Sequence, residues 1–206
     1  MTRPVFAAAA IAATLALAAP AAAECLTDAD LTRGIVARFE NGDTTLMRRM
    51  NDGYLTIREE YSDGSTPMLF RAHRGIYFVE EGEAATGGGF APGSELQVIF
   101  KTDPALLPDP LPGITWEGPT TNVFADGATR DETVTIRYSD APPLDLSGCS
   151  YEAVRAHIRY DWGDEGGMEL SYLYLPEVTT AVITSNHFDG EPPNTTIPVA
   201  LERYSK

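Results

Sequence analysis

Residues 41–75 read NGDTTLMRRMNDGYLTIREEYSDGSTPMLFRAHRG, in which the glycines recur every eleven residues, at 42, 53, 64 and 75. The first three follow Asn or Asp, and such dipeptides favour tight hairpin turns because glycine tolerates a positive φ. Between the turns apolar and polar residues alternate, and no helical i, i+4, i+7 stripe is present. The stretch therefore predicts an antiparallel meander in which every eleven residues supply one strand and one reversal.

The alternating pattern continues through the second half of the chain. Its longest run is Tyr151–Trp162, and shorter runs are expected at Leu96–Phe100, Thr133–Tyr138, Met168–Tyr174, Thr180–Thr184 and Ile197–Tyr204. Two loops rich in glycine or proline, Gly82–Ser94 and Thr102–Thr115, flank the first of these shorter runs. Only Thr27–Thr32 is predicted to be helical, with Thr27 as its N-cap. The expected fold is mainly β, a single curved antiparallel meander sheet or half-barrel of ten to twelve strands with one short N-terminal helix.

The N-terminal residues 1–23 have the pattern of an export signal. Arg3 is their only charge, an apolar stretch follows, and Ala21-Ala22-Ala23 forms a small-residue cleavage site before Glu24. The stretch is too short and too alanine-rich for a membrane anchor. We therefore predict a cleaved Sec-type signal, a single β-rich domain over residues 24–206, and a periplasmic or secreted location. No transmembrane segment is expected in the mature chain, because no later stretch approaches eighteen apolar residues.

The charge balance restricts the kinds of partner. The chain has 206 residues, with 15 Lys and Arg against 30 Asp and Glu, so its formal net charge is −15. Such a surface repels nucleic acids and anionic membranes, and we expect neither as a partner. A hydrophobic content of 43% is typical of a globular protein.

The chain has only two cysteines, Cys25 and Cys149. In an exported protein such a pair predicts a disulfide, which here would pin the mature N-terminus to the start of the longest predicted strand. Lipidation of Cys25 is disfavoured because the residue before it, Glu24, is charged. Closing a loop of about 125 residues should stabilise the fold by about 2–4 kcal/mol.

Residue patterns of catalysis and metal binding are sparse. The three histidines, at 73, 157 and 187, show no metal-ligand spacing, and His157 shares the polar face of its strand with two arginines. No Gly-x-Ser-x-Gly elbow or phosphate-binding loop is present. The acidic group Asp161, Asp164 and Glu165 lacks the ligand spacing of a calcium loop. We predict no catalytic residue, cofactor or metal site, and a protein that is not an enzyme.

One segment carries a family resemblance. Residues 149–182 contain a strand that opens near a cysteine, a turn, a strand that ends in LYLPEVT at 173–179, and a final apolar strand. This resembles a segment of uncharacterised bacterial periplasmic β-rich domains of unknown function, in which the corresponding end reads Trp-Tyr-x-Pro-Glu-Leu-Gly. Leu173 replaces the Trp and Thr179 the Gly. The resemblance implies a curved antiparallel sheet that wraps a helix or an apolar ligand, and it implies no reaction.

The strand aromatics suggest where a ligand would bind. On the concave side of a curved sheet, Tyr160, Trp162, Tyr172 and Tyr174 would line an apolar trough, although the same residues would equally build a packed core. The leading hypothesis is therefore a non-enzymatic binding or accessory module for an apolar small molecule. One alternative is a structural module that pairs a sheet edge with an envelope protein. A hydrolase is the other, and it would need a histidine within hydrogen-bond reach of a serine or carboxylate in a cleft.

Overall fold

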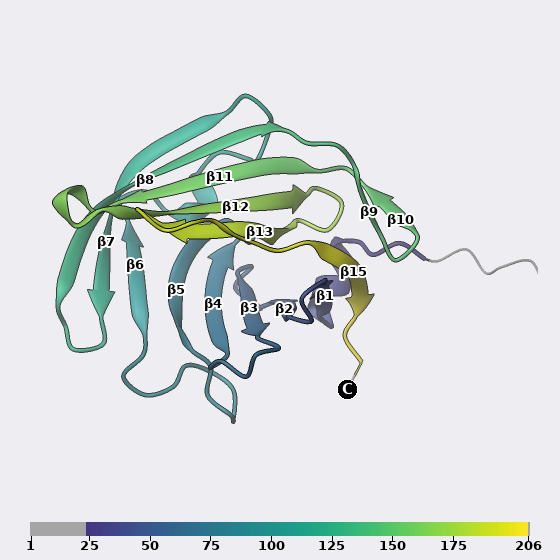
Figure 1. The fold of residues 1–206 in the computed structure, drawn as a ribbon, viewed down its shortest axis with the longest axis horizontal. Helices are drawn as coiled ribbons and strands as arrows, with labels where there is room; N and C mark the ends of the chain where they lie inside the picture. Colours follow the sequence, from purple (N-terminus) through teal and green to yellow (C-terminus); the bar gives the residue numbers. More distant parts are fainter. Residues whose placement is uncertain (1–23, 206) are drawn as a thin grey trace, which may run out of the picture.

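The computed structural model describes residues 24–205, so the predicted signal peptide at 1–23 lies outside the described part of the chain. The fold is mainly β, as expected: one large antiparallel sheet of thirteen strands, a separate two-stranded hairpin and three short 3-10 helices (Figure 1). The elements are η1 (Asp28–Thr32), β1 (Ile35–Phe39), β2 (Thr44–Arg49), β3 (Leu55–Glu60), β4 (Met68–His73), β5 (Tyr77–Glu83), β6 (Leu96–Phe100), η2 (Pro104–Leu106), β7 (Thr115–Phe124), β8 (Thr129–Asp140), β9 (Leu144–Leu146), β10 (Cys149–Tyr151), β11 (Val154–Asp161), η3 (Gly163–Glu165), β12 (Gly167–Leu175), β13 (Thr180–Phe188), β14 (Asn194–Thr195) and β15 (Pro198–Arg203).

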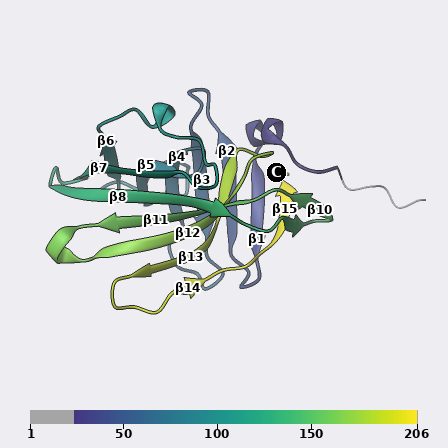
Figure 2. The same cartoon turned by 90° about the horizontal axis from the view of Figure 1, so that it is seen from above.

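The large sheet curls over itself. Its strand order is β14-β13-β12-β11-β8-β7-β6-β5-β4-β3-β2-β1-β15, and its two edge strands do not pair with each other. Strands β11–β13 cross over β2–β5, so two parts of the concave face meet (Figures 1 and 2). The Phe78 ring of β5 lies 5.8 Å from the Tyr172 ring of β12, and the Tyr138 hydroxyl of β8 donates to that of Tyr77 in β5 at 3.0 Å. The sheet therefore forms both layers of a single domain.

The meander predicted from the glycine repeat is present. Hairpins join β1 to β5 in succession, and the glycines at their turns have left-handed φ angles of 90°, 88°, 81° and 69° at 42, 53, 64 and 75. Alternation decides the faces: Leu55 and Ile57 of β3 are buried, whereas Thr56 and Arg58 are half-buried. The helix η1 also begins where expected, because the Thr27 backbone N–H donates to Asp30 Oδ2 at 2.9 Å.

The strand count exceeds the expected ten to twelve for identifiable reasons. Strand β7 was not predicted because its Gly118-Pro119 pair disfavours strands, yet β6 and β8 flank it on both sides. The predicted run Tyr151–Trp162 divides into β10 and β11, and the longest strand is β8. Cys149 therefore opens the short strand β10, not the longest strand.

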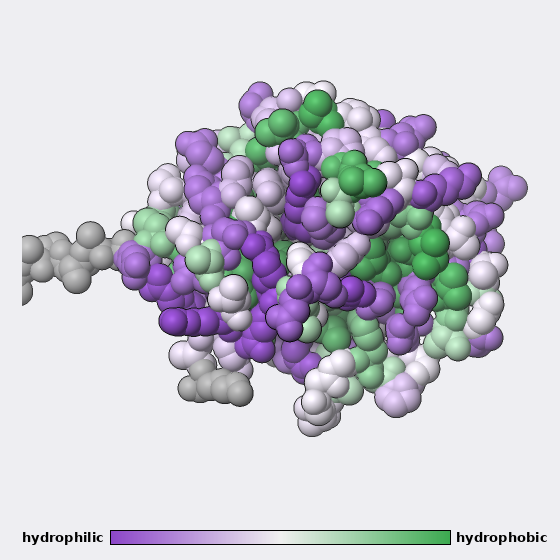
Figure 3. All heavy atoms as spheres, turned by 180° about the vertical axis from the view of Figure 1, so that it is seen from behind, coloured by the Kyte–Doolittle hydropathy of each residue, from purple (hydrophilic) through white to green (hydrophobic). Residues whose placement is uncertain are grey.

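The core lies between the two layers. Its largest fully buried side chains come from both parts of the sheet and from η1, and they include Tyr77, Leu31, Ile35, Met47, Leu55, Ile136 and Ile158. Figure 3 shows apolar surface gathered on the side of the molecule where β5–β7 lie, interrupted by hydrophilic side chains. Within residues 24–205, no helix is both long and apolar enough to span a bilayer.

One turn of the meander touches the opposite layer. Gly75 has a φ of 69°, and a Cβ at this position would lie 2.9 Å from the backbone nitrogen of Ala181 in β13. Gly75→Ala is therefore expected to lower the free energy of unfolding by about 1–3 kcal/mol, measured by urea denaturation. Gly53→Ala is the matched control, since its φ is 88° and nothing lies within 4 Å of its added Cβ. Equal losses in the two variants would contradict the close approach of this turn to β13.

Candidate functional site

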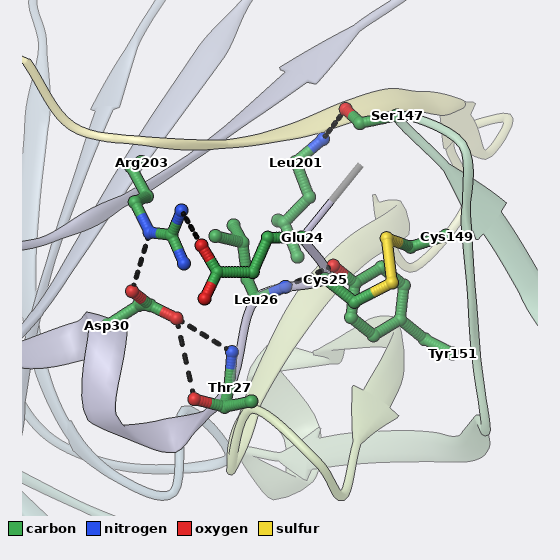
Figure 4. Close-up of a disulfide and its surroundings, with 10 residues drawn as sticks. All are labelled: Glu24, Cys25, Leu26, Thr27, Asp30, Ser147, Cys149, Tyr151, Leu201 and Arg203. Atoms are coloured by element: carbon green, nitrogen blue, oxygen red, sulfur yellow. Dashed lines mark hydrogen bonds and ion pairs between the residues drawn. A yellow bond between two sulfur atoms is a disulfide. The ribbon is translucent and has the colours of Figure 1, made fainter. Parts of the chain in front are cut away.

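The predicted disulfide joins Cys25 to Cys149, with Cα atoms 5.5 Å apart and a sequence separation of 124 (Figure 4). The prediction is confirmed. Next to the bridge, the backbone N–H of Leu26 donates to the buried Tyr151 hydroxyl at 3.0 Å. The bridge therefore fastens the N-terminal segment to the β9–β10 hairpin. That hairpin in turn covers the edge of the large sheet, because Ser147 Oγ accepts from the Leu201 N–H of β15 at 3.1 Å.

A second set of contacts holds the segment after Cys25. Arg203 of β15 bonds to Asp30 at 2.8 Å and to Glu24 at 3.1 Å (Figure 4). Arg49 of β2 holds Asp28 through both of its terminal nitrogens. These bonds lower the pKa values of Asp28 and Asp30, mainly through the side-chain hydrogen bonds from Arg49 and Arg203 respectively. The start of the described chain is thus attached to both β2 and β15.

The lowered pKa values predict a loss of stability in acid. A carboxyl whose pKa is lower in the folded than in the unfolded chain stabilises the fold above its unfolded value, and this contribution is lost as the pH falls through the folded value. The free energy of unfolding should therefore drop below about pH 4. Urea denaturation at neutral pH and at acid pH measures the drop. In the double variant Asp28→Asn, Asp30→Asn the drop should be smaller, and an unchanged drop would contradict this assignment.

The LYLPEVT segment forms the reversal between β12 and β13. Asp28 N–H donates to the Glu177 carbonyl at 2.8 Å, and the Thr179 hydroxyl bonds to Asp28 and Arg49. Thr179 has a φ of 54°, which is strained for a β-branched residue. This is the position at which the resembled pattern has glycine, the residue that such a backbone favours. The segment is thus a structural junction between the N-terminal segment, β2 and the β12–β13 turn.

The four aromatics of the candidate ligand face lie inside the curled sheet. Tyr160, Tyr172 and Tyr174 are each less than a tenth exposed and belong to the core, and Trp162 is half-buried against it. The protein's own side chains therefore occupy the space where the sequence predicted an apolar trough. Sequence alternation identified the inward face correctly, but it contained no information on how the opposite layer would fill that face.

An open cavity of about 370 Å³ lies where β13 and β14 approach the ends of β1–β3. We call it the groove. It is lined by Phe39, Asn41, Asp43, Thr44, Thr45, Glu59, Glu60, Tyr61, Ser62, Asp63, Ser65, Ile183, Ser185, Asn186, Asn194 and Thr196. Four of these side chains are carboxylates, and neither Lys nor Arg is among them. The volume suits a small molecule, and most of the lining residues have polar side chains.

The rim of the groove is held by hydrogen bonds between two turns. Asp43 Oδ1 accepts from the Ser62 N–H at 2.8 Å, and Asp43 Oδ2 accepts from Asn41 Nδ2 at 2.8 Å. Ser62 Oγ in turn donates to the Asn41 carbonyl at 2.8 Å. The β1–β2 turn and the β3–β4 loop are therefore tied together at the groove, so this side of the cavity is preformed.

Glu59 lies on the inner side of the groove. It is the third inward residue of β3 after Leu55 and Ile57, a position at which the strand pattern would place an apolar side chain. The Tyr61 hydroxyl donates to Glu59 Oε2 at 2.8 Å. Burial raises the pKa of Glu59, and the nearby charge of Asp43 adds to this. A half-buried carboxyl with a raised pKa in a cavity is a recognised mark of a functional site.

Further polar groups continue inward from Glu59. Tyr160 and Tyr172 are buried, and Glu81 is half-buried. Burial raises the pKa of Tyr172, and the charge of Glu59 contributes next. Burial and then the charges of Glu132 and Glu81 do the same for Tyr160. The charges of inward carboxyls thus act on both hydroxyls.

Glu132 of β8 is the last of these inward polar groups, and its carboxylate accepts hydrogen bonds from three side chains. It is 6% exposed and accepts from Thr120 at 2.8 Å, Asn122 at 3.0 Å and Trp162 Nε1 at 2.8 Å. The Arg130 guanidinium lies over the Trp162 ring, 4.1 Å from its centroid. A cation, a carboxylate and an aromatic ring thus meet at Glu132, with the protein's own arginine as the cation.

Glu81 tests how burial and the charge of Glu132 act on these inward polar groups. Burial is the main cause that raises its pKa, and the charge of Glu132 is the next. An acid with a raised folded pKa destabilises the fold increasingly as the pH rises from its unfolded value through its folded value. Glu81→Gln is therefore expected to raise the melting temperature at pH 7 and to leave it unchanged near pH 4, measured by calorimetry. A lower melting temperature at pH 7 would contradict this assignment.

The sheet register unites residues that are distant in the sequence. On the outer face, His157 of β11 has Nδ1 3.4 Å from Ser171 Oγ and Nε2 3.4 Å from Glu169 Oε2, and His187 Nε2 lies 3.7 Å from the same oxygen. Sequence spacing gave no sign of this cluster, because only the pairing of three strands brings it together: His157 lies opposite Ser171, and Glu169 lies opposite His187. His73 lies apart, against a second cavity that also touches Arg49 and Arg74.

The cluster around Glu169 does not line the groove. Across residues 24–205, no three His, Cys, Asp or Glu side chains are placed to hold a metal ion together. The acidic group Asp161, Asp164 and Glu165 lies at the turn between β11 and β12, where η3 forms. Among the surface features, the groove therefore combines enclosure, charge and half-buried polar groups most fully.

Comparison with known proteins gives one weak structural likeness. No family model matches the chain, and no curated protein does. The chain is similar to the crystal structure of the hypothetical lipoprotein YmcC from Escherichia coli (K12), with a TM-score of 0.41 and 11% sequence identity. The match covers 74% of this chain and 77% of that chain. A likeness of this size assigns neither a family nor a function.

Proposed function

We propose that this chain is an exported, non-enzymatic binding module that takes a small polar molecule into the groove. The observation that carries the proposal is the groove itself, a cavity of about 370 Å³ with a tied rim and the half-buried Glu59 on its inner side. A carboxyl that is held in a cavity at the expense of stability is typical of a binding or catalytic site. This replaces the apolar trough, because side chains fill the concave face.

Export is supported by two independent features. The disulfide between Cys25 and Cys149 is of the kind that persists in oxidising compartments, and the sequence before it has the pattern of a cleaved signal. We also propose a relationship to the periplasmic β-rich domains that residues 149–182 resemble. The left-handed backbone at Thr179 supports this relationship, because the resembled pattern has glycine there.

The groove favours binding over catalysis because its lining offers carboxylates, hydroxyls and amides without a histidine. The arrangement of Ser171, His157 and Glu169 meets part of the requirement for a hydrolase, but it lies on an open strand face. The sheet edges give less support to the alternative of a module that pairs an edge strand with an envelope protein. Strand β14 has two residues, and the β9–β10 hairpin contacts β15 through Ser147.

Filling the groove tests the proposal. Asn186 lines it and pairs with the buried Leu170, so Asn186→Trp should obstruct the cavity. The neighbouring His187 pairs with Glu169 on the opposite face, so His187→Trp adds the same bulk outside it. Native mass spectrometry of protein extracted gently from the periplasm should show a retained small molecule on the wild type and on His187→Trp, and none on Asn186→Trp. A bare wild-type protein, or a molecule that all three proteins retain, would overturn the proposal.

A further inference from the structure

The lining of the groove is negatively charged. Asp43, Glu59, Glu60 and Asp63 line it, and no lysine or arginine does. Glu60 has a partner in Arg58 at 2.5 Å, whereas Glu59 bonds only to the uncharged Tyr61. Glu59 is thus a half-buried carboxylate without a cation among the described residues. A carboxylate in such a place gains most from a ligand that brings a positive charge.

An aromatic ring beside Glu59 supplies a second indication. Tyr61 lines the groove, and its hydroxyl donates to Glu59 Oε2 at 2.8 Å. A ligand that reaches Glu59 would therefore also meet the aromatic face of Tyr61.

A carboxylate, an aromatic ring and a cation already meet near Glu132, at the far end of the inward polar groups. Arg130 places its guanidinium over Trp162 at 4.1 Å, and Trp162 donates to Glu132 at 2.8 Å. The carboxylate, the ring and the cation thus form one unit that the chain supplies in full. At the groove end the carboxylate is Glu59 and the neighbouring ring is Tyr61, and no lysine or arginine lines this cavity. A cationic ligand would complete the same combination of carboxylate, ring and cation at the groove.

We propose that the groove binds an organic ammonium ion, with its charged nitrogen at Glu59 and its carbon skeleton along Tyr61. The inference rests on the proposed function and adds the chemical class of the ligand. Aromatic rings and carboxylates together recognise ammonium groups through cation–π attraction and charge-assisted hydrogen bonds. An anion would be repelled by the four carboxylates. The cavity is also larger than a bare metal ion needs, and 370 Å³ suits a molecule with several carbon atoms.

Isothermal titration calorimetry with choline and with spermidine tests this inference. The neutral analogue of choline, in which a tert-butyl group replaces the trimethylammonium group, controls for shape. Glu59→Gln removes the central charge, and Glu165→Gln is the matched control, because it removes one charge from an exposed position at η3. We expect at least one of the two cations to bind the wild type, and Glu59→Gln to weaken that binding about tenfold or more. Glu165→Gln should bind like the wild type, and the neutral analogue should not bind.

Two results would overturn the inference. One is that neither cation binds the wild type. The other is that Glu59→Gln and Glu165→Gln bind a cation equally, which would indicate attraction to the net charge alone. A neutral or anionic molecule that the wild type retains and Asn186→Trp lacks would leave the groove as a binding site and refute only the ligand class. If Asn186→Trp retains the small molecule as the wild type does, the groove is not the binding site.

Discussion

Tyr77→Ala is expected to lower the free energy of unfolding by about 3–5 kcal/mol, the usual cost of truncating a large buried aromatic. Tyr77 is fully buried where β5 faces β8, and its ring packs edge-on against Trp116, with centroids 6.2 Å apart. Its hydroxyl donates to the Pro108 carbonyl at 2.6 Å and accepts from Tyr138 at 3.0 Å. The substitution therefore removes contacts with both layers and with the loop before β7. Urea denaturation measures the loss.

Tyr77→Phe is the matched control, since it keeps the ring and removes only the hydroxyl. Its expected cost is about 1–2 kcal/mol, because the half-buried Pro108 carbonyl and the buried Tyr138 hydroxyl each lose a hydrogen bond. A loss below about 1 kcal/mol for Tyr77→Ala would show that the site is not a packed core. The concave face would then be an open trough, as the sequence alone allowed.

Removing the disulfide is expected to have the second large effect. The bridge closes a loop with a sequence separation of 124, so the double variant Cys25→Ser, Cys149→Ser should be less stable by about 2–4 kcal/mol. The N-terminal segment is also held by Tyr151, Arg49 and Arg203, and the variant keeps these contacts. These remaining contacts predict that the variant still folds.

The intact mass of the protein, before and after reduction, is the companion measurement. Alkylation should modify neither cysteine before reduction and both afterwards. Reduced wild-type protein and the double serine variant should have the same stability within error, since both lack only the bridge. Two alkylated thiols in the untreated protein would contradict the disulfide, and an unchanged unfolding midpoint in the variant would contradict its contribution to stability.

Much of the fold could be predicted because it depends on local rules. The eleven-residue glycine spacing determined the hairpins of β1–β5, and the alternation of strands such as β3 determined which side chains point inward. Strand β7 escaped prediction because Gly118-Pro119 disfavours a strand locally, and only pairing with β6 and β8 favours it. The curl of the sheet depends on contacts between distant strands, such as Phe78 with Tyr172, which local patterns do not encode.

The candidate site was harder to predict for the same reason. The disulfide followed from there being only two cysteines, whereas the groove unites turns near Asp43 and Ser62 with residues of β13 and β14. One signal was present in the sequence: Glu59 continues the inward parity of Leu55 and Ile57, so an acid stands where an apolar residue is expected. Such a break in the pattern indicates a functional position more directly than the aromatics did.

Two-dimensional nitrogen–proton NMR spectra, recorded while choline or spermidine is added to the oxidised protein, test the central claim most directly. The claim is that the groove, and not the concave face, receives the ligand. The account predicts that the amide signals which move will belong to groove residues, above all Thr45, Tyr61 and Asn186. Signals from the packed interior, such as Ile158 and Tyr174, should stay in place. Shifts that centre on β11 and the interior, or on the edge strand β15, would contradict it.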